Sequence, residues 1–133
     1  MAENISEGAK GSGVNVKLKR AEECSVRDLV EADGIAVGSP TYFSNVAWQV
    51  KKLIDESITA YGAANSLKDK VGTCFTSGGT KRDGLQCLKM LEVAFGFHHK
   101  MKLIPGIVST SEDKKEIEQA CKNQGRKIAS QLK

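Results

Sequence analysis

Two short, mainly apolar runs, at residues 34–38 and 71–75, restrict the fold of this chain more than any other feature. Each is followed by a polar loop and then by apolar residues at helical spacing. A strand that is buried on one face alternates apolar and polar residues, whereas a continuously apolar strand is buried on both faces. Such strands belong to parallel sheets whose connecting helices cover both faces, so the sequence predicts an α/β fold with a parallel sheet.

The remaining segments extend this alternation of helix and strand. We expect helices near residues 1–10, 25–33, 45–58, 85–95 and 112–132, and strands at 14–18, 34–38, 71–75 and 102–108. Ser25 and Asp28 have the spacing of a capping box, and Ser44 or Asn45 can cap the third helix. Pro105 indicates that the last strand is an edge strand. The predicted buried stripes of two helices are Ala47, Val50, Leu53, Ile54 and Ile58, and Leu85, Leu88, Leu91 and Phe95.

Composition limits the class of protein. The chain has 133 residues, is 40% hydrophobic and carries a net charge of +4. This length and apolar content predict one globular domain, residues 1–133. Neither a membrane span nor a secretory signal is visible, so we expect a cytoplasmic protein without a membrane partner. The basic residues form no stripe among exposed aromatics, which argues against nucleic-acid binding. The four cysteines, Cys24, Cys74, Cys87 and Cys121, lack metal-ligand spacing, so we expect reduced thiols and no metal site.

Two polar loops follow the buried strands, where open parallel sheets bind ligands. The first, Gly-Ser-Pro-Thr-Tyr-Phe-Ser-Asn at residues 38–45, resembles the flavin loop of the flavodoxin-like NAD(P)H:quinone oxidoreductases (the WrbA family) and related FMN reductases. The resemblance implies that Pro40 stiffens the loop along the isoalloxazine ring and that Tyr42 or Phe43 covers an aromatic face. The alternative is an ordinary turn with a helix cap. The cofactor-binding residues it implies in this loop are Ser39, Pro40, Thr41, Tyr42, Phe43, Ser44 and Asn45.

The second loop, at residues 75–80, resembles the Ser/Thr/Gly-rich loop that passes close to the flavin in the same family. It implies cofactor contacts by Thr76, Ser77, Gly78, Gly79 and Thr80. Small residues let the backbone approach a ligand, and hydroxyl groups supply hydrogen bonds. By itself this signal is weak, because many glycine-rich turns look alike.

A histidine pair precedes the last strand. Phe97-His98-His99-Lys100-Met101 is similar to the His-His-Gly-Met stretch of the family, whose second histidine lies near the flavin; the resemblance implies that His99 is catalytic. Histidine titrates near neutral pH and could deliver a proton to a reduced quinone. The alternative is a histidine that a helix C-terminus favours through its dipole.

The resemblance covers residues 1–108, but the first strand and phosphate loop of the family have no counterpart here. With that strand restored, the chain has five strands and five helices, a flavodoxin-like doubly wound parallel sheet of order 2-1-3-4-5. We therefore expect an N-terminally incomplete domain in which residues 14–18 have no neighbouring strand. The strand at 14–18 and the one at 34–38 could pair directly, borrow a strand from another chain, or remain partly molten.

These observations predict an FMN-dependent NAD(P)H oxidoreductase that reduces a small-molecule acceptor, a quinone, with an incomplete site for the FMN phosphate. The alternatives are a flavodoxin-type electron carrier and a non-catalytic remnant. An iron–sulfur flavoprotein is disfavoured by the scattered cysteines. The family implies a homo-oligomer, and Trp48 beside an apolar stripe is either an interface residue or edge-of-core packing.

Overall fold

A four-stranded sheet of order β2-β1-β3-β4 forms the centre of the molecule in the computed structural model, which describes residues 1–62 and 64–132. The strands β1 (Gly34–Tyr42), β3 (Val71–Ser77) and β4 (Lys102–Ser109) run parallel, and β2 (Asn45–Val46) is antiparallel to the end of β1. The predicted flavodoxin-like α/β fold and the edge position of the last strand are confirmed.

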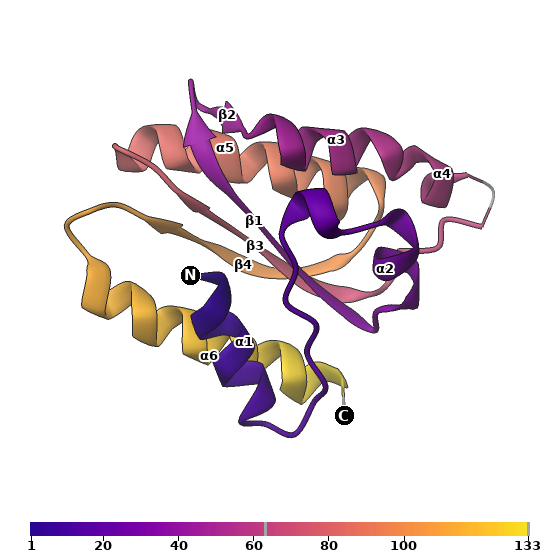
Figure 1. Ribbon diagram of the computed structural model, residues 1–133, viewed down its shortest axis with the longest axis horizontal. Helices are drawn as coiled ribbons and strands as arrows, with labels where there is room; N and C mark the ends of the chain where they lie inside the picture. The colour runs from indigo at the N-terminus through magenta and orange to yellow at the C-terminus, as the bar shows by residue number, and fades with distance from the viewer. Residues whose placement is uncertain (63, 133) are drawn as a thin grey trace.

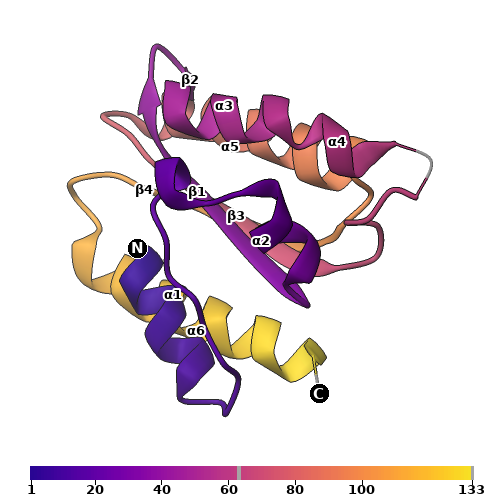
Figure 2. The ribbon, with the colours of Figure 1, turned by 45° about the vertical axis from the view of Figure 1, so that its right-hand side comes forward.

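Helices cover both faces of this sheet (Figures 1 and 2). One face carries α1 (Ala2–Lys10) and α6 (Lys114–Leu132), and the other carries α3 (Trp48–Glu56), α4 (Ile58–Tyr61), α5 (Lys81–Glu92) and the π-helical turn η2 (Val93–His98). The short helices η1 (Ala21–Glu23) and α2 (Val26–Glu31) precede β1. The core under α5 includes Leu91 and Phe95, both at most 1% exposed.

Helices α1 and α6 pack with their backbones in contact. A Cβ atom on Gly8 would lie 2.0 Å from the carbonyl oxygen of Lys122, and one on Gly125 would lie 2.0 Å from that of Ile5. Only glycine permits such an approach, so these two residues fix the spacing of the helix pair.

The predicted strand at residues 14–18 is wrong. Residues 14–20 belong to no helix or strand, and Leu18 is 51% exposed. Alternation alone does not make a strand, because a strand also needs a neighbour for its backbone hydrogen bonds. Along the described chain, the edge of β1 that faces away from β3 pairs only at Thr41 and Tyr42, with β2.

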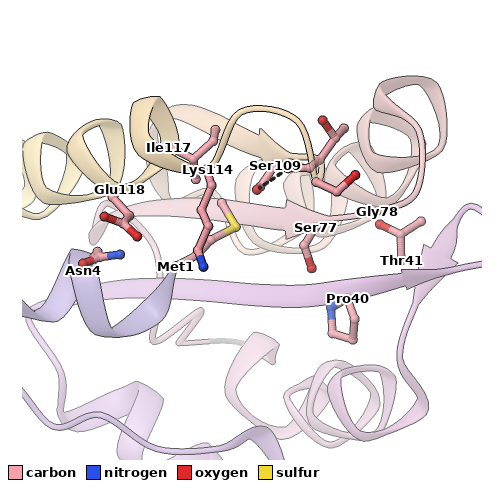
Figure 3. A pocket seen from close by; sticks show the side chains of 12 residues that line it. Met1, Asn4, Pro40, Thr41, Ser77, Gly78, Ser109, Lys114, Ile117 and Glu118 are labelled. Carbon is pink, nitrogen blue, oxygen red and sulfur yellow. Dashed lines mark hydrogen bonds between the residues drawn. The ribbon is translucent and has the colours of Figure 1, made fainter.

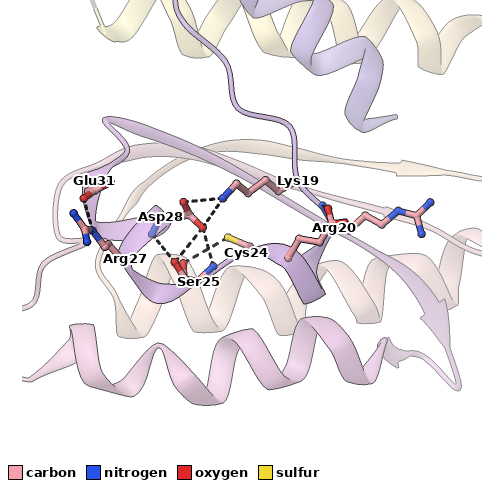
Figure 4. A network of polar contacts seen from close by, with 8 residues as sticks. Lys19, Arg20, Cys24, Ser25, Arg27, Asp28 and Glu31 are labelled. Atoms are coloured by element: carbon pink, nitrogen blue, oxygen red, sulfur yellow. Dashed lines mark hydrogen bonds and ion pairs between the residues drawn. The ribbon is translucent and has the colours of Figure 1, made fainter.

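A polar network ties this extended segment to α2 (Figure 4). The Nζ atom of Lys19 donates to both carboxylate oxygens of Asp28 at 3.0 Å. The predicted capping box of Ser25 and Asp28 is confirmed, with both hydrogen bonds present. The hydrogen bond from the Ser25 backbone, followed by that from Lys19, lowers the pKa of Asp28 to about 2.

Three predictions about helix α3 and its flanks are wrong. The N-cap of α3 is Ala47, because Ser44 and Asn45 belong to a hairpin. Ile58 is 65% exposed and is the first residue of the separate short helix α4, because α3 ends at Glu56. Trp48 is 70% exposed, which excludes packing at the edge of the core. On α5, Leu85 is also exposed.

All four cysteines are free, and Cys74, Cys87 and Cys121 are buried, as expected for reduced thiols. Burial raises the pKa of Cys74 to about 12. Across residues 1–62 and 64–132, no helix has both the length and the apolarity needed to cross a membrane.

Candidate functional site

The first predicted flavin loop is a β-hairpin. Strand β1 continues through residues 39–42, turns at Phe43 and Ser44, and pairs with β2 through Tyr42 opposite Asn45. Phe43 has a φ angle of 50° and Ser44 one of 61°. Both values lie in the left-handed region that two-residue hairpin turns require. Neither residue is the glycine or asparagine favoured there, so the turn is strained. Phe43 is fully exposed at the tip.

Side-chain hydrogen bonds hold the hairpin against the start of α5. The Ser44 hydroxyl donates to Asp83 Oδ1 at 2.8 Å, and the Thr80 hydroxyl donates to Asp83 Oδ2 at 2.9 Å. The Thr80 hydroxyl also accepts from the Asp83 backbone N–H, so Thr80 is the N-cap of α5. The hydrogen bond from Ser44, followed by that from Thr80, lowers the pKa of Asp83. Two predicted site residues thus position the hairpin through one carboxylate.

Two other predicted residues are buried, and their hydroxyls are used within the protein. Ser39 donates to the Pro40 carbonyl oxygen at 2.7 Å and accepts from the Ala47 N–H at 2.9 Å. Thr76 donates to the carbonyl oxygen of Gly84 at 2.8 Å. These contacts fix the first loop and the first turn of α5, so both residues support the site from within.

A crevice of about 460 Å³ opens at the carboxyl ends of the three parallel strands (Figure 3). Predicted residues from both loops line it: Pro40, Thr41, Ser77 and Gly78. The Thr41 hydroxyl oxygen is buried without a hydrogen-bond partner among the described residues, and Thr41 is one of the residues that line the crevice. Tyr42, Phe43, Ser44, Asn45, Gly79 and Thr80 lie beside the crevice and do not line it.

The crevice also contains residues that the sequence analysis missed. Ser109 ends β4, Thr110 and Ser111 follow it, and the three residues form the third wall of the crevice. The signal was present, because a third polar loop after a parallel strand belongs at the same end of the sheet. Lys114 extends from the first turn of α6 toward Met1 and Asn4 at the N-terminus of α1 (Figure 3).

The start of α1 is suited to an anion. Within the described residues no side chain caps this helix, and the N–H groups of the first turn of a helix have no partner inside the helix. These groups and the helix dipole favour a phosphate, and Lys114 adds a positive charge. Glu118 lines the same side as Lys114, so the charge there is mixed. The hydroxyl groups and the close glycine backbone along the strand ends, with Lys114 beside the helix terminus, are groups that fit FMN.

The structure does not bring His99 to this crevice. Helix α5 and the turn η2 carry the chain from the carboxyl end of the sheet back to its amino end, and His99 follows η2. At the rise of an α-helix, the length of this stretch separates His99 from the crevice by roughly 25 Å. His99 is only 4% exposed. Within this chain, His99 therefore does not contact a ligand in the crevice.

At the amino end, His99 is held by a serine and two aromatic rings. Its Nε2 atom lies 2.8 Å from the Ser57 Oγ atom, which itself donates to the Ile54 carbonyl oxygen at 2.6 Å. The His99 ring stacks on Phe95, with centroids 5.9 Å apart, and meets the edge of Tyr61. Because the Ser57 proton is already donated, Nε2 carries the hydrogen and donates to Ser57. Burial, with a smaller contribution from His98, lowers the pKa of His99.

The fold and the crevice define a flavodoxin-like protein with a ligand site at the carboxyl end of its sheet. Residues 12–115 match the family model described as NADPH-dependent FMN reductase, and the chain belongs to this FMN-binding family.

Three comparisons add detail. A flavodoxin of Aquifex aeolicus is 33% identical over 144 residues, covering 97% of this chain and 77% of that protein. NAD(P)H dehydrogenase (quinone) 3 of Rhizobium meliloti is 34% identical over 104 residues, covering 63% of this chain and 49% of that protein. The crystal structure of the flavodoxin, WrbA-like protein from Agrobacterium tumefaciens has a TM-score of 0.81 and 25% identity, over 98% of this chain and 85% of that one.

Proposed function

We propose that this chain binds FMN in the carboxyl-end crevice and, as a cytoplasmic homo-oligomer, uses NAD(P)H to reduce quinones. The observation that carries the proposal is the crevice itself, where both predicted flavin loops meet beside an unpartnered Thr41 hydroxyl. The relative named as a quinone dehydrogenase supports the choice of acceptor, although this chain spans about half of its length.

Different residues of the crevice would contact different parts of FMN. Pro40 and Thr41 would border the isoalloxazine ring on one side, and Ser77 and Gly78 on another. The phosphate would lie at the N-terminus of α1, within reach of Lys114. Tyr42, exposed beside this edge, would cover part of the ring.

FMN, when bound, would supply the redox chemistry between NAD(P)H and the acceptor. The protein contributes position. The Ser44 and Asp83 hydrogen bond fixes the hairpin, so that ring-bordering groups keep one arrangement while substrates exchange. Ser77 would offer a hydroxyl group to the ring edge, and Thr41 would do so once its buried hydroxyl turns toward the ligand.

Two threonines on neighbouring strands test the site. Thr41→Val removes a hydroxyl without a protein partner among the described residues, so we expect unchanged stability and a roughly two- to ten-fold loss of FMN affinity. Thr76→Val, the matched control, removes the hydrogen bond to Gly84 and should destabilise the protein by about 1–3 kcal/mol. Fluorescence titration with FMN and chemical denaturation measure both. Absence of FMN binding in the parent, or equal affinities in parent and Thr41→Val, would contradict the proposal.

An electron carrier is the second candidate, because the Aquifex aeolicus relative is a flavodoxin that aligns with nearly the whole chain. Against it stands the net charge of +4, since a basic surface does not match the acidic character expected of such carriers. Stepwise reduction of the FMN-loaded protein separates the two. A stable one-electron state, together with negligible NAD(P)H-dependent quinone reduction, would favour the carrier.

A further inference from the structure

The outer face of α5 and η2 combines apolar and positively charged side chains. Figures 1 and 2 show α5 on the side of the sheet opposite α1 and α6. At the three- and four-residue spacings of one helical face, the exposed residues include Arg82, Leu85, Lys89, Met90, Val93 and Phe97. Phe97 is 74% exposed. Large apolar side chains that lie together on a surface are typical of an interaction site.

The exposed charges of this face have one sign. Along residues 81–100, which the structure describes throughout, the exposed charged side chains are Lys81, Arg82, Lys89 and Lys100. The two acids of this stretch, Asp83 and Glu92, are only partly exposed. Asp83 is also occupied by the hydroxyl groups of Ser44 and Thr80. The exposed charge is therefore positive from the first turn of α5 to the end of η2.

The β1–β2 hairpin adds an aromatic residue at the start of this face. Because Ser44 donates to Asp83 in the first turn of α5, the hairpin tip lies next to that turn. Phe43 is fully exposed at the tip. Exposed aromatic residues beside cations are typical of surfaces that contact the headgroup region of a bilayer.

An anionic lipid surface fits this face better than other occupants do. A second copy does not fit, because a two-fold contact of the face with itself would set cations against cations. Nucleic acid does not fit either, since aliphatic side chains such as Leu85 and Val93 offer it neither hydrogen bonds nor stacking. A bilayer with anionic headgroups supplies both partners: negative charge for the lysine and arginine side chains, and acyl chains for the apolar ones.

We propose that the outer face of α5 and η2, with the tip of the hairpin, binds peripherally to a membrane that carries anionic lipids. The sequence analysis expected no membrane partner because it found no spanning segment, and peripheral binding requires none. The described residues that line the ligand crevice come from elements other than α5, so the bound face leaves the crevice open. An apolar quinone dissolves in lipid, so binding here would bring the protein to its acceptor; this consequence alone rests on the proposed function.

Cosedimentation with lipid vesicles, without FMN, tests this face. The parent should bind vesicles of phosphatidylglycerol and phosphatidylcholine in equal parts, and bind vesicles of phosphatidylcholine alone far more weakly. High salt should release it, because salt screens the charges. Lys81→Glu with Lys89→Glu should weaken binding to the anionic vesicles at least about ten-fold. Leu85→Gln should weaken it several-fold and leave the dependence on salt unchanged.

The matched control is Arg126→Glu with Lys127→Glu, which makes the same change of charge on exposed residues of α6, on the other face of the sheet. It should bind the anionic vesicles nearly as tightly as the parent. Circular dichroism establishes that each variant is folded.

Other results would overturn the proposal. A parent that does not bind anionic vesicles, or a control weakened as much as Lys81→Glu with Lys89→Glu, would contradict the lipid surface. A change of mass in that α5 variant, measured by sedimentation equilibrium without lipid, would assign the face to contacts between copies. Binding of the parent to poly-glutamate and not to vesicles would assign it to an acidic protein partner. Because FMN is absent, these results leave the flavin proposal untouched.

Discussion

The loops at the two ends of the sheet differ in how they pack. At the amino end, His99 is buried against Phe95 and bonded to Ser57. At the carboxyl end, Phe43 is fully exposed on a strained turn, and the Thr41 hydroxyl is buried without a partner in the described chain. The sheet is the same at both ends, so the difference lies in the loops. Strain and unpartnered groups occur at both ends, because Asp69 and Lys100 at the amino end also have positive φ angles and His99 Nδ1 is buried without a partner in the described chain. The carboxyl end differs in opening onto a crevice at three strand ends, which is where such sheets bind ligands.

Removing the largest buried ring at the amino end should have the largest effect. Phe95→Ala should lower the free energy of unfolding by about 3–5 kcal/mol, because it removes buried apolar area and leaves a cavity. Phe43→Ala at the carboxyl end is the control and should change it little. Urea denaturation measures both. Similar losses in the two variants would erase the contrast between the ends.

Lowering the pH should destabilise the folded protein through protonation of His99 at the amino end of the sheet. Its pKa lies below the ordinary value of 6.5 in the folded protein, so the unfolded chain takes up the proton more readily. This contribution to stability is complete above pH 6.5 and is lost as the pH falls through the folded pKa. His99→Gln should remove this part of the pH dependence and lower neutral stability by about 1–3 kcal/mol.

His98→Gln is the control for that variant; it removes only the smaller contribution of His98 to the pKa of His99, so most of the pH dependence of the parent should remain. Quinone turnover of the same two variants tests the predicted catalytic role. If His99→Gln reduces quinones at the rate of the parent and with the same pH profile, the role of His99 is structural and not catalytic.

The exposed aromatic residue beside the crevice should affect the ligand more than the fold. Tyr42→Ala should weaken FMN binding by about 0.5–1.5 kcal/mol, since an aromatic contact is lost. Tyr42→Phe keeps the ring and should bind like the parent. Fluorescence titration measures all three proteins, and equal affinity in Tyr42→Ala would make this loop an ordinary turn.

Relieving the strain in the hairpin should give the smallest change in the free energy of unfolding, and this change should be a gain in stability. Phe43→Gly should stabilise the protein by about 0.5–1 kcal/mol, because glycine adopts a positive φ without the steric penalty of a side chain. Phe97→Gly, at an exposed residue of the helical turn η2, should destabilise it by a similar amount. Thermal denaturation compares the pair. A loss of stability in Phe43→Gly would mean that the tip is unstrained.

The sequence predicted the central elements because their patterns are local. The runs that became β1 and β3, and the Ser25 capping box, carry their own signals. The hairpin was missed because Phe43-Ser44 lacks the glycine or asparagine that normally marks such a turn. Residues 14–18 have strand alternation, but pairing depends on a neighbour that local pattern cannot supply.

The sequence also predicted part of the candidate site. Pro40, Thr41, Ser77 and Gly78 were expected near the ligand and line one crevice. The sequence could not show which hydroxyl groups point into the protein interior. Ser39 and Thr76 do so, and they differ from their neighbours only in the side of the strand on which they lie.

The half-paired strand β1 should be visible in the rate at which its amides exchange with deuterium. Residues that point their N–H toward β3 are protected by the ladder, while the alternate residues point toward an edge that is open in the described chain before Thr41. Fast and slow amides should therefore alternate from Ile35 to Ser39. The same open edge is a template for strand addition, so concentrated or warmed samples should aggregate through β1 before the helices unfold.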